Sequence, residues 1–234
     1  MKNKEQYQLS TANGRMLAIG DIHGCHAALT ALLAQVQLRP ADTVIFTGDY
    51  IDRGLASRQV IDDLLFLHKF CSPVFLRGNH EGMMLDAREN PLKLVFWRDC
   101  GGLETLLSYG TDYRVDWISE IPDSHWKFFE RTAKFFETDT HIFVHAYVDP
   151  KLEMKDQRES LLLWGYFDWL QPHKSGKKIV CGHTVQDSGG IKDVGFAVCI
   201  DTGVATGGWL SCLDVKSGRF WQANERGETY NGKL

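Results

Sequence analysis

The feature that most constrains the fold of this chain is a short apolar run that ends in a polar segment, a construction that occurs four times. The clearest run, at 43–47, leads directly into GDYIDRG at 48–54. It is too short for a helix and rich in β-branched residues, so it predicts a buried strand. Its end carries Asp49, Asp52 and Arg53, and ligands bind at such strand ends in open α/β sheets. Taken alone, the segment also fits a polar loop in which an aspartate caps a turn.

The spacing of the polar segments indicates parallel strands joined by helices. GDIHG occupies 20–24 and GNHE occupies 78–81, and each follows an apolar run. Asp49 follows Asp21 by 28 positions and precedes Asn79 by 30. A strand, a crossover helix and the next parallel strand need about this many residues. We therefore expect an α/β fold in which these segments meet in one cleft.

The rest of the chain predicts one domain over 1–234 with a helical insertion. Apolar and aromatic residues recur at helical spacing over 81–136, where no strand is evident, and we interpret them as core. Strand character returns at 141–145 and 178–181, and the segment from 195 to 222 is typical of β-structure. No repeat or linker interrupts the chain, so a single domain is expected.

Composition excludes several classes of function. The formal net charge of −4 argues against a general nucleic-acid or membrane surface. No stretch approaches the roughly 18–20 apolar residues of a membrane span, and no apolar leader follows the polar start at 1–6. The six cysteines form no C-x-x-C pair, which excludes a zinc knuckle or redox motif of that type. We expect a cytoplasmic protein with reduced cysteines and without nucleic-acid or membrane partners.

The polar side chains that follow predicted strands form a set of metal-binding types. They are two carboxylates, an amide and four imidazoles: Asp21, His23, Asp49, Asn79, His80, His145 and His183. Such donors suit divalent first-row metals. Even six such donors are too many for one catalytic metal that keeps open positions. They suit two metals with a shared bridge, the arrangement used for phosphoryl displacement. The other histidines match no motif and predict surface or packing positions: His26, His68, His125, His141 and His173.

This pattern resembles the calcineurin-like metallophosphoesterases and, within them, the phosphoprotein phosphatase family of Ser/Thr phosphatases with its small bacterial and phage members. The resemblance is carried by five motifs in order: GDIHG at 20–24, GDYIDRG at 48–54, RGNHE at 77–81, VHA at 144–146 and GHT at 182–184. It implies a metallophosphatase-type β-sandwich, with two mixed sheets flanked by helices and a helical insertion.

The resemblance also implies a role for each site residue. Two divalent metal ions, manganese first and iron or zinc as alternatives, would be held by Asp21 and His23, by Asp49 as the bridge, and by Asn79, His145 and His183. A metal-bridging hydroxide would attack phosphorus in line. His80 would protonate the leaving oxygen, Asp52 would orient His80, and Arg53 would hold the phosphate. For Arg77 we expect a structural ion pair, and Glu81 is interpreted either as an aid to His80 or as a first-turn helix acid.

Two departures from the family pattern bear on the phosphate site. Tyr147 stands where the family commonly has glycine, and Gly165-Tyr166 follows Trp164 where a second phosphate-binding arginine is common. Arg158, upstream of Trp164, is an alternative source of that charge. Both tyrosines would line the pocket and bring a phenol donor or a stacking face.

Three functions are carried forward from the sequence. The first is a dinuclear-metal-dependent phosphomonoester hydrolase, a serine/threonine or dual-specificity protein phosphatase. The second is a hydrolase of dinucleoside polyphosphates or other small phosphate esters, whose relatives tend to lack the acid found here as Asp52. The third is a non-catalytic metal-binding regulatory module, which predicts loss of His80, Asp52 or a ligand, whereas all are present. Neither G-x-G-x-x-G nor a P-loop motif occurs, so nucleotide-binding folds of those types are excluded.

Overall fold

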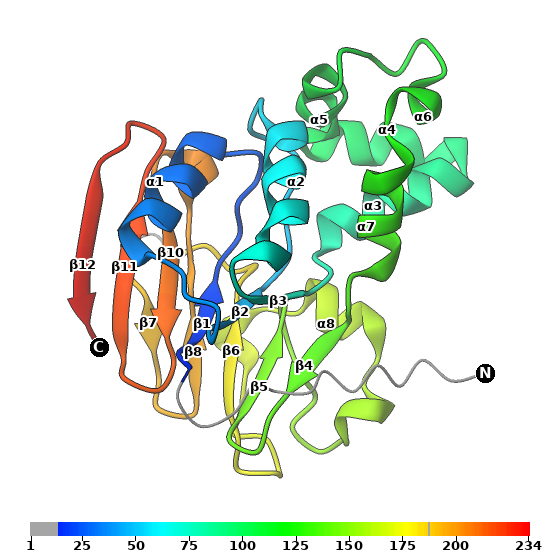
Figure 1. Cartoon of the computed structure of the whole chain (residues 1–234). Helices are drawn as coiled ribbons and strands as arrows, with labels where there is room; N and C mark the ends of the chain where they lie inside the picture. Colours follow the sequence, from blue (N-terminus) through cyan, green and yellow to red (C-terminus); the bar gives the residue numbers. More distant parts are fainter. Residues whose placement is uncertain (1–13, 187) are drawn as a thin grey trace.

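The computed structural model describes residues 14–186 and 188–234, and the polar segment 1–6 lies outside them. Two mixed β-sheets pack face to face, and helices cover their outer surfaces (Figure 1). This confirms the predicted α/β class with two mixed sheets and flanking helices. In the described part of the chain, no helix is long and apolar enough to cross a membrane.

The first sheet carries the three N-terminal motifs at the carboxyl ends of its parallel strands. Strands β1, β2 and β3 are parallel neighbours, and Ile19, Phe46 and Phe75 lie side by side at their carboxyl ends. The polar segments that follow therefore emerge together, as the spacing predicted. In the order of the sheet, the strands are β12 (Thr229–Lys233), β11 (Arg219–Ala223), β10 (Trp209–Asp214), β1 (Met16–Ile19), β2 (Thr43–Phe46) and β3 (Ser72–Phe75), with β9 (Asp201–Thr202) paired to β10.

The second sheet brings the two C-terminal motifs to the same place. Its parallel neighbours β5 and β6 end directly before His145 and Gly182. In the order of the sheet, the strands are β4 (Phe135–Glu137), β5 (His141–Val144), β6 (Lys178–Cys181), β8 (Ala197–Cys199) and β7 (Lys192–Asp193).

Alternation along the strands determines the three layers. In β1, Leu17 and Ile19 face the helices, whereas Ala18 faces the second sheet. Ala18 joins Ile45 and Val180 in the apolar layer between the sheets, as expected for side chains with a period of two. The helices are α1 (His26–Val36), α2 (Ser57–Phe66), α3 (Asn79–Glu89), α4 (Leu94–Trp97), α5 (Leu103–Ser108), α6 (Trp117–Glu120), α7 (Asp123–Arg131) and α8 (Glu159–Trp164), with short 3₁₀ or π segments at Leu67–Lys69, Pro91–Lys93, Arg98–Gly102, Met154–Asp156, Phe167–Trp169 and Val204–Thr206.

The helical insertion is real, but its predicted end was wrong. Helices α3 to α7 run from Asn79 to Arg131, and the next segment, Phe135–Glu137, is strand β4 rather than helix. Phe136 is buried between the sheets, where its ring lies 6.0 Å from that of Phe143. Pairing with β5 gives the segment 135–137 its strand conformation, which a run of only three residues does not indicate by itself.

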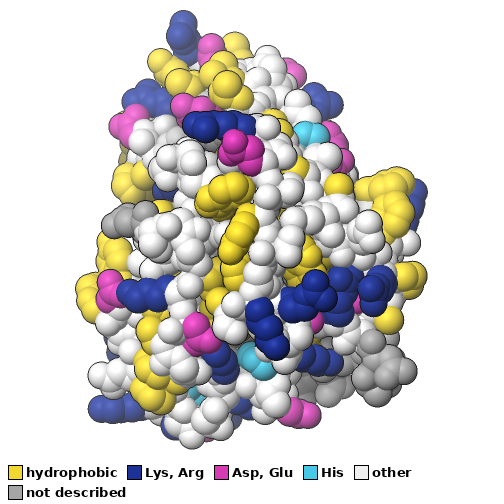
Figure 2. Space-filling model, turned by 90° about the vertical axis from the view of Figure 1, so that its left-hand side faces the viewer, with side chains coloured by type: hydrophobic (Ala, Val, Ile, Leu, Met, Phe, Trp, Pro, Cys, Tyr) yellow, Lys and Arg dark blue, Asp and Glu magenta, His cyan; other side chains and the backbone are white. Residues whose placement is uncertain are grey.

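The face on the side of β12 is mixed in character. Viewed from this side, basic and acidic side chains lie among hydrophobic ones (Figure 2). Charges on an edge strand, such as Lys233 on β12, disfavour pairing with another chain. The candidate site lies away from this edge, at the carboxyl ends of β1, β2 and β3.

Candidate active site

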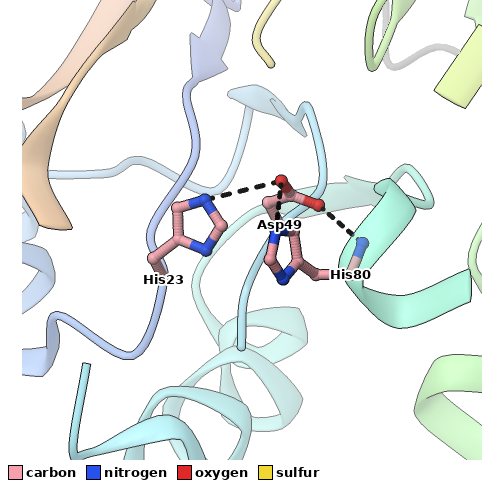
Figure 3. Close-up of side chains that lie close together, drawn as sticks. All are labelled: His23, Asp49 and His80. Carbon is pink, nitrogen blue, oxygen red and sulfur yellow. Dashed lines mark hydrogen bonds and ion pairs between the residues drawn. The ribbon is translucent and has the colours of Figure 1, made fainter. Parts of the chain in front are cut away.

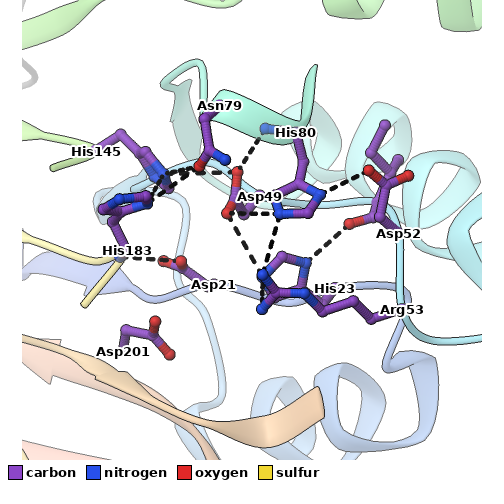
Figure 4. Close-up of polar contacts among 12 residues, drawn as sticks. Asp21, His23, Asp49, Asp52, Arg53, Asn79, His80, His145, His183 and Asp201 are labelled. Atoms are coloured by element: carbon purple, nitrogen blue, oxygen red, sulfur yellow. Dashed lines mark hydrogen bonds and ion pairs between the residues drawn. The ribbon is translucent and has the colours of Figure 1, made fainter. Parts of the chain in front are cut away.

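The six predicted metal ligands and the predicted acid His80 converge from both sheets (Figure 4). Three of the motifs follow β1, β2 and β3, and two follow β5 and β6. All seven side chains are buried or half-buried: Asp21, His23, Asp49, Asn79, His80, His145 and His183. The sandwich therefore places together residues that are up to 162 positions apart.

One group of three donors lies around one oxygen of Asp49 (Figure 3). His23, Asp49 and His80 offer ligand atoms that lie within 4.8 Å of one another. Nε2 of His23 is 3.5 Å from Oδ2 of Asp49, and Nε2 of His80 is 3.9 Å from the same oxygen. Three donors at these separations can surround one metal ion.

A second group lies around the other oxygen of Asp49. Asp49, His145 and His183 also offer ligand atoms within 4.8 Å of one another, and Oδ1 of Asp49 is 3.6 Å from Nε2 of His145. Oδ1 of Asn79 is 2.9 Å from this Nε2 and 3.1 Å from Nδ1 of His183. Its two oxygens face different groups, so Asp49 is the donor that two cations would share.

Backbone carbonyls orient two of the histidines. Nδ1 of His23 donates to the carbonyl of Ile51 over 3.0 Å, and Nδ1 of His145 donates to that of Thr47 over 2.9 Å. Each contact leaves Nε2 as the lone-pair nitrogen, which is the usual arrangement for a metal-binding histidine. Burial lowers the pKa of His23 to about 3, lowers that of His145, and lowers that of His183 to about 3. These imidazoles are therefore neutral and able to bind a metal near pH 7.

The second group passes a chemical test for a cation. With His145 donating to Thr47, its Nε2 is an acceptor, and the neighbouring Oδ1 atoms of Asn79 and Asp49 are acceptors as well. Buried acceptors facing one another repel unless a proton or a cation lies between them. Burial alone would raise the pKa of Asp49, but the imidazoles, His145 and His80 first, lower it below its usual range. The donors present therefore fit a divalent ion.

Asp21 lies next to these groups but belongs to neither of them. One of its oxygens accepts the N–H of His183 over 2.9 Å, and the other accepts the hydroxyl of Thr47 over 3.3 Å. Burial raises its pKa well above the usual range, with Asp201 and Asp49 as further causes. The structure thus places Asp21 at the centre but turned toward the loop of the fifth motif.

The predicted His80–Asp52 pair is present and buried. Nδ1 of His80 is 2.6 Å from Oδ2 of Asp52. The same Oδ2 accepts the indole N–H of Trp97 over 2.8 Å, and Oδ1 accepts the hydroxyl of Thr105 over 2.7 Å. Burial lowers the pKa of His80, but Asp49 and Asp52 outweigh it and raise that pKa above the usual value. The pair therefore favours a protonated imidazole.

Arg53 lies across the first group. Its guanidinium donates to Nε2 of His23 over 3.0 Å and lies 3.2 Å from Nε2 of His80. Its backbone N–H donates to the carbonyl of Gly101 over 3.0 Å, which anchors the loop to the helical insertion. A planar guanidinium in this place can hold two oxygens of a phosphate.

Backbone strain concentrates at the site. In the described part of the chain, six residues other than glycine have positive φ, and all but Gln37 belong to the motifs: His23 (48°), Asp49 (52°), Asp52 (74°), Arg53 (67°) and His183 (65°). Each such conformation costs of the order of 1–3 kcal/mol and persists only where the surrounding structure imposes it. The strain directs these side chains into the centre.

Sequence reasoning missed Trp97 and Thr105, whereas Glu81 is a first-turn acid of α3, as one of its two interpretations expected. The carboxylate of Glu81 accepts the backbone N–H groups of Gly78, Asp49 and Tyr50 over 2.8–2.9 Å. Glu81 thus supports the loop of the second motif rather than His80, and burial and Asp49 raise its pKa to about 8. Glu81 could be singled out from the sequence because it belongs to the GNHE motif, whereas no motif contains Trp97 or Thr105.

Arg77 and His125 have structural surroundings. Arg77 donates to the hydroxyl of Thr132 over 2.9 Å and to the carbonyl of Glu130 over 3.0 Å, so it closes the end of α7. Its distance of 4.0 Å from Glu159 makes the expected ion pair a weak one. His125, one of the histidines outside the motifs, is buried beside the hydroxyl of Tyr109.

The side of the centre that lacks the second arginine is aromatic. The rings of Trp164 and Tyr166 each lie 6.2 Å from that of His183, and both side chains are exposed. Tyr147 packs against Gly165, where a Cβ would clash with it. Beside them lies a cavity of about 620 Å³ that reaches Asn79 and is lined by Arg77, Met83, Leu92, Phe96, Leu163 and Trp164, among others.

Comparison with known proteins points to phosphoesterases. Residues 14–199 match the model of the family described as calcineurin-like phosphoesterase. Serine/threonine-protein phosphatase 2 of Salmonella typhimurium strain LT2 is 30% identical over 215 residues, which cover 85% of this chain and 91% of that protein. The symmetrical bis(5'-nucleosyl)-tetraphosphatase of Pectobacterium carotovorum is 46% identical over 65 residues, or 27% of this chain and 22% of that protein.

Solved structures share the fold. A protein serine/threonine phosphatase from Saccharomyces cerevisiae has a TM-score of 0.62 at 17% identity, with 96% of this chain and 81% of that chain covered. The cold-active protein-tyrosine phosphatase of a Shewanella species has a TM-score of 0.64 at 15% identity, with 94% and 80% covered. At these identities the likeness shows the common architecture alone.

Proposed function

The chain belongs to the calcineurin-like phosphoesterase family and is a metal-dependent phosphatase, and on this premise we propose that it hydrolyses phosphoserine and phosphothreonine in proteins. The observation that carries the proposal is the buried His80–Asp52 pair, 2.6 Å apart, beside two groups of ligand atoms that share Asp49. A positioned acid next to a two-metal centre is what cleavage of an alkyl phosphate ester needs, because its leaving group is a poor one.

We propose that two divalent ions, Mn²⁺ by first choice, are held at the two groups. The first would be held by His23 and by Asp21, which lies beside the first group, while His80 of that group stays free to act as the acid. The second would be held by Asn79, His145 and His183, with Asp49 shared. When bound, such ions supply Lewis-acid chemistry, neutralising phosphate charge and making water nucleophilic at neutral pH. Iron and zinc are alternatives for the same donors.

The remaining steps belong to side chains of the chain itself. Arg53 binds two phosphate oxygens and turns the ester toward His80. His80, kept protonated by Asp49 and Asp52, gives its proton to the leaving oxygen of the serine or threonine side chain. Trp97 and Thr105 hold Asp52 in place, so that the imidazole has a single orientation.

A dinucleoside polyphosphate is the second candidate substrate. The match to a symmetrical bis(5'-nucleosyl)-tetraphosphatase, 46% identical over 65 residues, favours it. The exposed rings of Trp164 and Tyr166 would supply a stacking face for a base. Asp52 favours the protein substrate, because relatives that hydrolyse dinucleoside polyphosphates tend to lack this acid.

The test is hydrolysis of p-nitrophenyl phosphate by metal-stripped protein, with and without added Mn²⁺, beside a His80→Asn variant. We expect activity that requires the metal and a loss of about 10²–10⁴-fold in kcat on an alkyl phosphate such as a phosphoserine peptide. Turnover of that peptide and of diadenosine tetraphosphate by the wild-type protein would then separate the two substrates. Unchanged peptide hydrolysis in His80→Asn would contradict the proposed acid.

A further inference from the structure

Asp201 is a buried carboxylate at the centre to which no motif assigned a role. It lies on β9, directly after β8 and Ile200, and is 3% exposed. Figure 4 shows its carboxylate beside that of Asp21. It is therefore a third acidic side chain, with Asp21 and Asp49, in the buried part of the site.

The backbone around Asp201 ties it to both neighbouring motifs. The N–H of Ile200 donates to the carbonyl of Cys181 over 2.9 Å, and the carbonyl of Asp201 accepts the N–H of Gln186 over 3.0 Å. These contacts bracket the loop that carries His183. A Cβ at Gly20 would clash with the carbonyl of Ile200, so the segment also packs directly against the first motif. Asp201 is therefore fixed relative to Asp21 and His183 at once.

One oxygen of Asp201 has a structural partner. Oδ1 accepts the N–H of Gly203 over 3.1 Å, which closes the turn after β9. An asparagine can make this same hydrogen bond through its own Oδ1. The structural part of the role can thus be kept while the charge is removed.

The charge of Asp201 is the unexplained part. Its carboxyl group lies within hydrogen-bonding reach of that of Asp21. Arg53, the guanidinium at the centre, lies against the imidazoles of His23 and His80 instead. Buried like charges destabilise a protein unless a proton or a cation lies between them. A divalent ion beside Asp21 would be such a cation, and the extra carboxylate would strengthen its binding.

We propose that Asp201 is a positioning residue for the first metal, where its fixed carboxylate orients Asp21 and adds the negative charge that retains a divalent cation between Asp21, His23 and Asp49. The inference rests on the proposed metal centre and deepens it. Residues that orient and charge a metal ligand typically change affinity by about 10–100-fold. The effect should be confined to one of the two ions, because His145 and His183 belong to the other group.

The test is calorimetric titration of metal-free protein with Mn²⁺, using wild type and Asp201→Asn. We expect two equivalents in the wild type, and in the variant a first site weakened by about 10–100-fold with the second site unchanged. Asp214→Asn is the matched control. Asp214 is also buried at a strand end and accepts the N–H of the residue two positions on, Lys216, but it lies at the opposite end of β10 from the pairing with Asp201.

Asp201→Glu, which keeps the charge, separates charge from structure. We expect it to bind Mn²⁺ more tightly than Asp201→Asn, and equal weakening in both variants would overturn the inference in favour of a structural role. Wild-type affinities in a folded Asp201→Asn protein would overturn it as well. If wild type itself failed to bind two Mn²⁺ ions, the proposed metal centre would fall together with the role of Asp201.

Discussion

The two halves of the site are supported in different ways. On the metal side, His23 and His145 are oriented by the backbone carbonyls of Ile51 and Thr47, in the segment that follows β2. On the acid side, Asp52 is held by side chains, and its two main partners come from the helical insertion (Trp97, Thr105). One half is thus built into the sheet, and the other depends on a neighbouring layer of helices.

This difference bears on the question whether the insertion is a lid. Trp97 is fully buried, and the carbonyl of Gly101 accepts the N–H of Arg53. Gly101 has φ of +108°, and a Cβ there would meet the backbone of Arg53 at 2.8 Å. This part of the insertion is therefore packed against the site as a support. Changes in it should alter turnover without removing metal, whereas changes on the metal side should do both.

The largest effect is expected from Asp49→Asn, which removes the charge shared by both groups of ligand atoms. We expect Mn²⁺ binding to fall below two equivalents, and kcat to fall by more than the about 10²–10⁴-fold expected for loss of a general acid. Metal content by atomic spectroscopy and phosphatase rates would be measured on the same samples. A variant with two tightly bound ions would show that Asp49 is no bridge.

Asp52→Asn should lower kcat within about 10²–10⁴-fold while both ions remain bound. Asp49 and Asp52 raise the pKa of His80, and His80 acts while protonated, so activity is lost as pH rises through that pKa. Removing the charge of Asp52 lowers the pKa of His80, so the alkaline limb of the kcat profile should move to lower pH. A limb that stays in place, or moves upward, would argue that His80 is not the acid.

Trp97→Phe tests the support from the insertion, because it keeps an aromatic ring and removes the N–H that reaches Asp52. We expect a loss of about 10–100-fold in kcat with unchanged Mn²⁺ stoichiometry. Trp117→Phe is the control, since Trp117 is buried 5.2 Å from Trp97 and its indole does not bond to Asp52. Equal losses in the two variants would indicate general damage to the insertion.

Glu81→Gln should give the smallest effect and acts on the side-chain support of the metal half. The amide cannot accept three backbone N–H groups as the carboxylate does, so we expect about 1–3 kcal/mol of lost stability in the metal-free protein. Chemical denaturation would measure it, with Glu89→Gln, exposed on the same helix, as control. A stability equal to wild type would mean that other groups satisfy these donors.

Much of the centre could be predicted from the sequence because its metal-binding side chains directly follow strands. A buried strand of apolar residues can carry polar side chains only beyond its ends. Parallel strands bring their carboxyl ends together at one side of the sheet. The motifs therefore predicted the joint position of Asp49, His80, His145 and His183, which the structure confirms.

By itself, then, the sequence determined the order of the strands' polar ends, the chemistry of the donors and the existence of a helical insertion. The tertiary structure alone decided what surrounds them: the contacts of Trp97 and Thr105 with Asp52, the orientation of Glu81, and the strained backbone at Asp49 and Asp52. The physical reason is that motif residues are constrained by local geometry and short spacing. Supporting residues such as Trp97 and Thr105, in contrast, lie in segments whose sequence pattern predicts only that they are buried. The pattern does not predict which residues they contact.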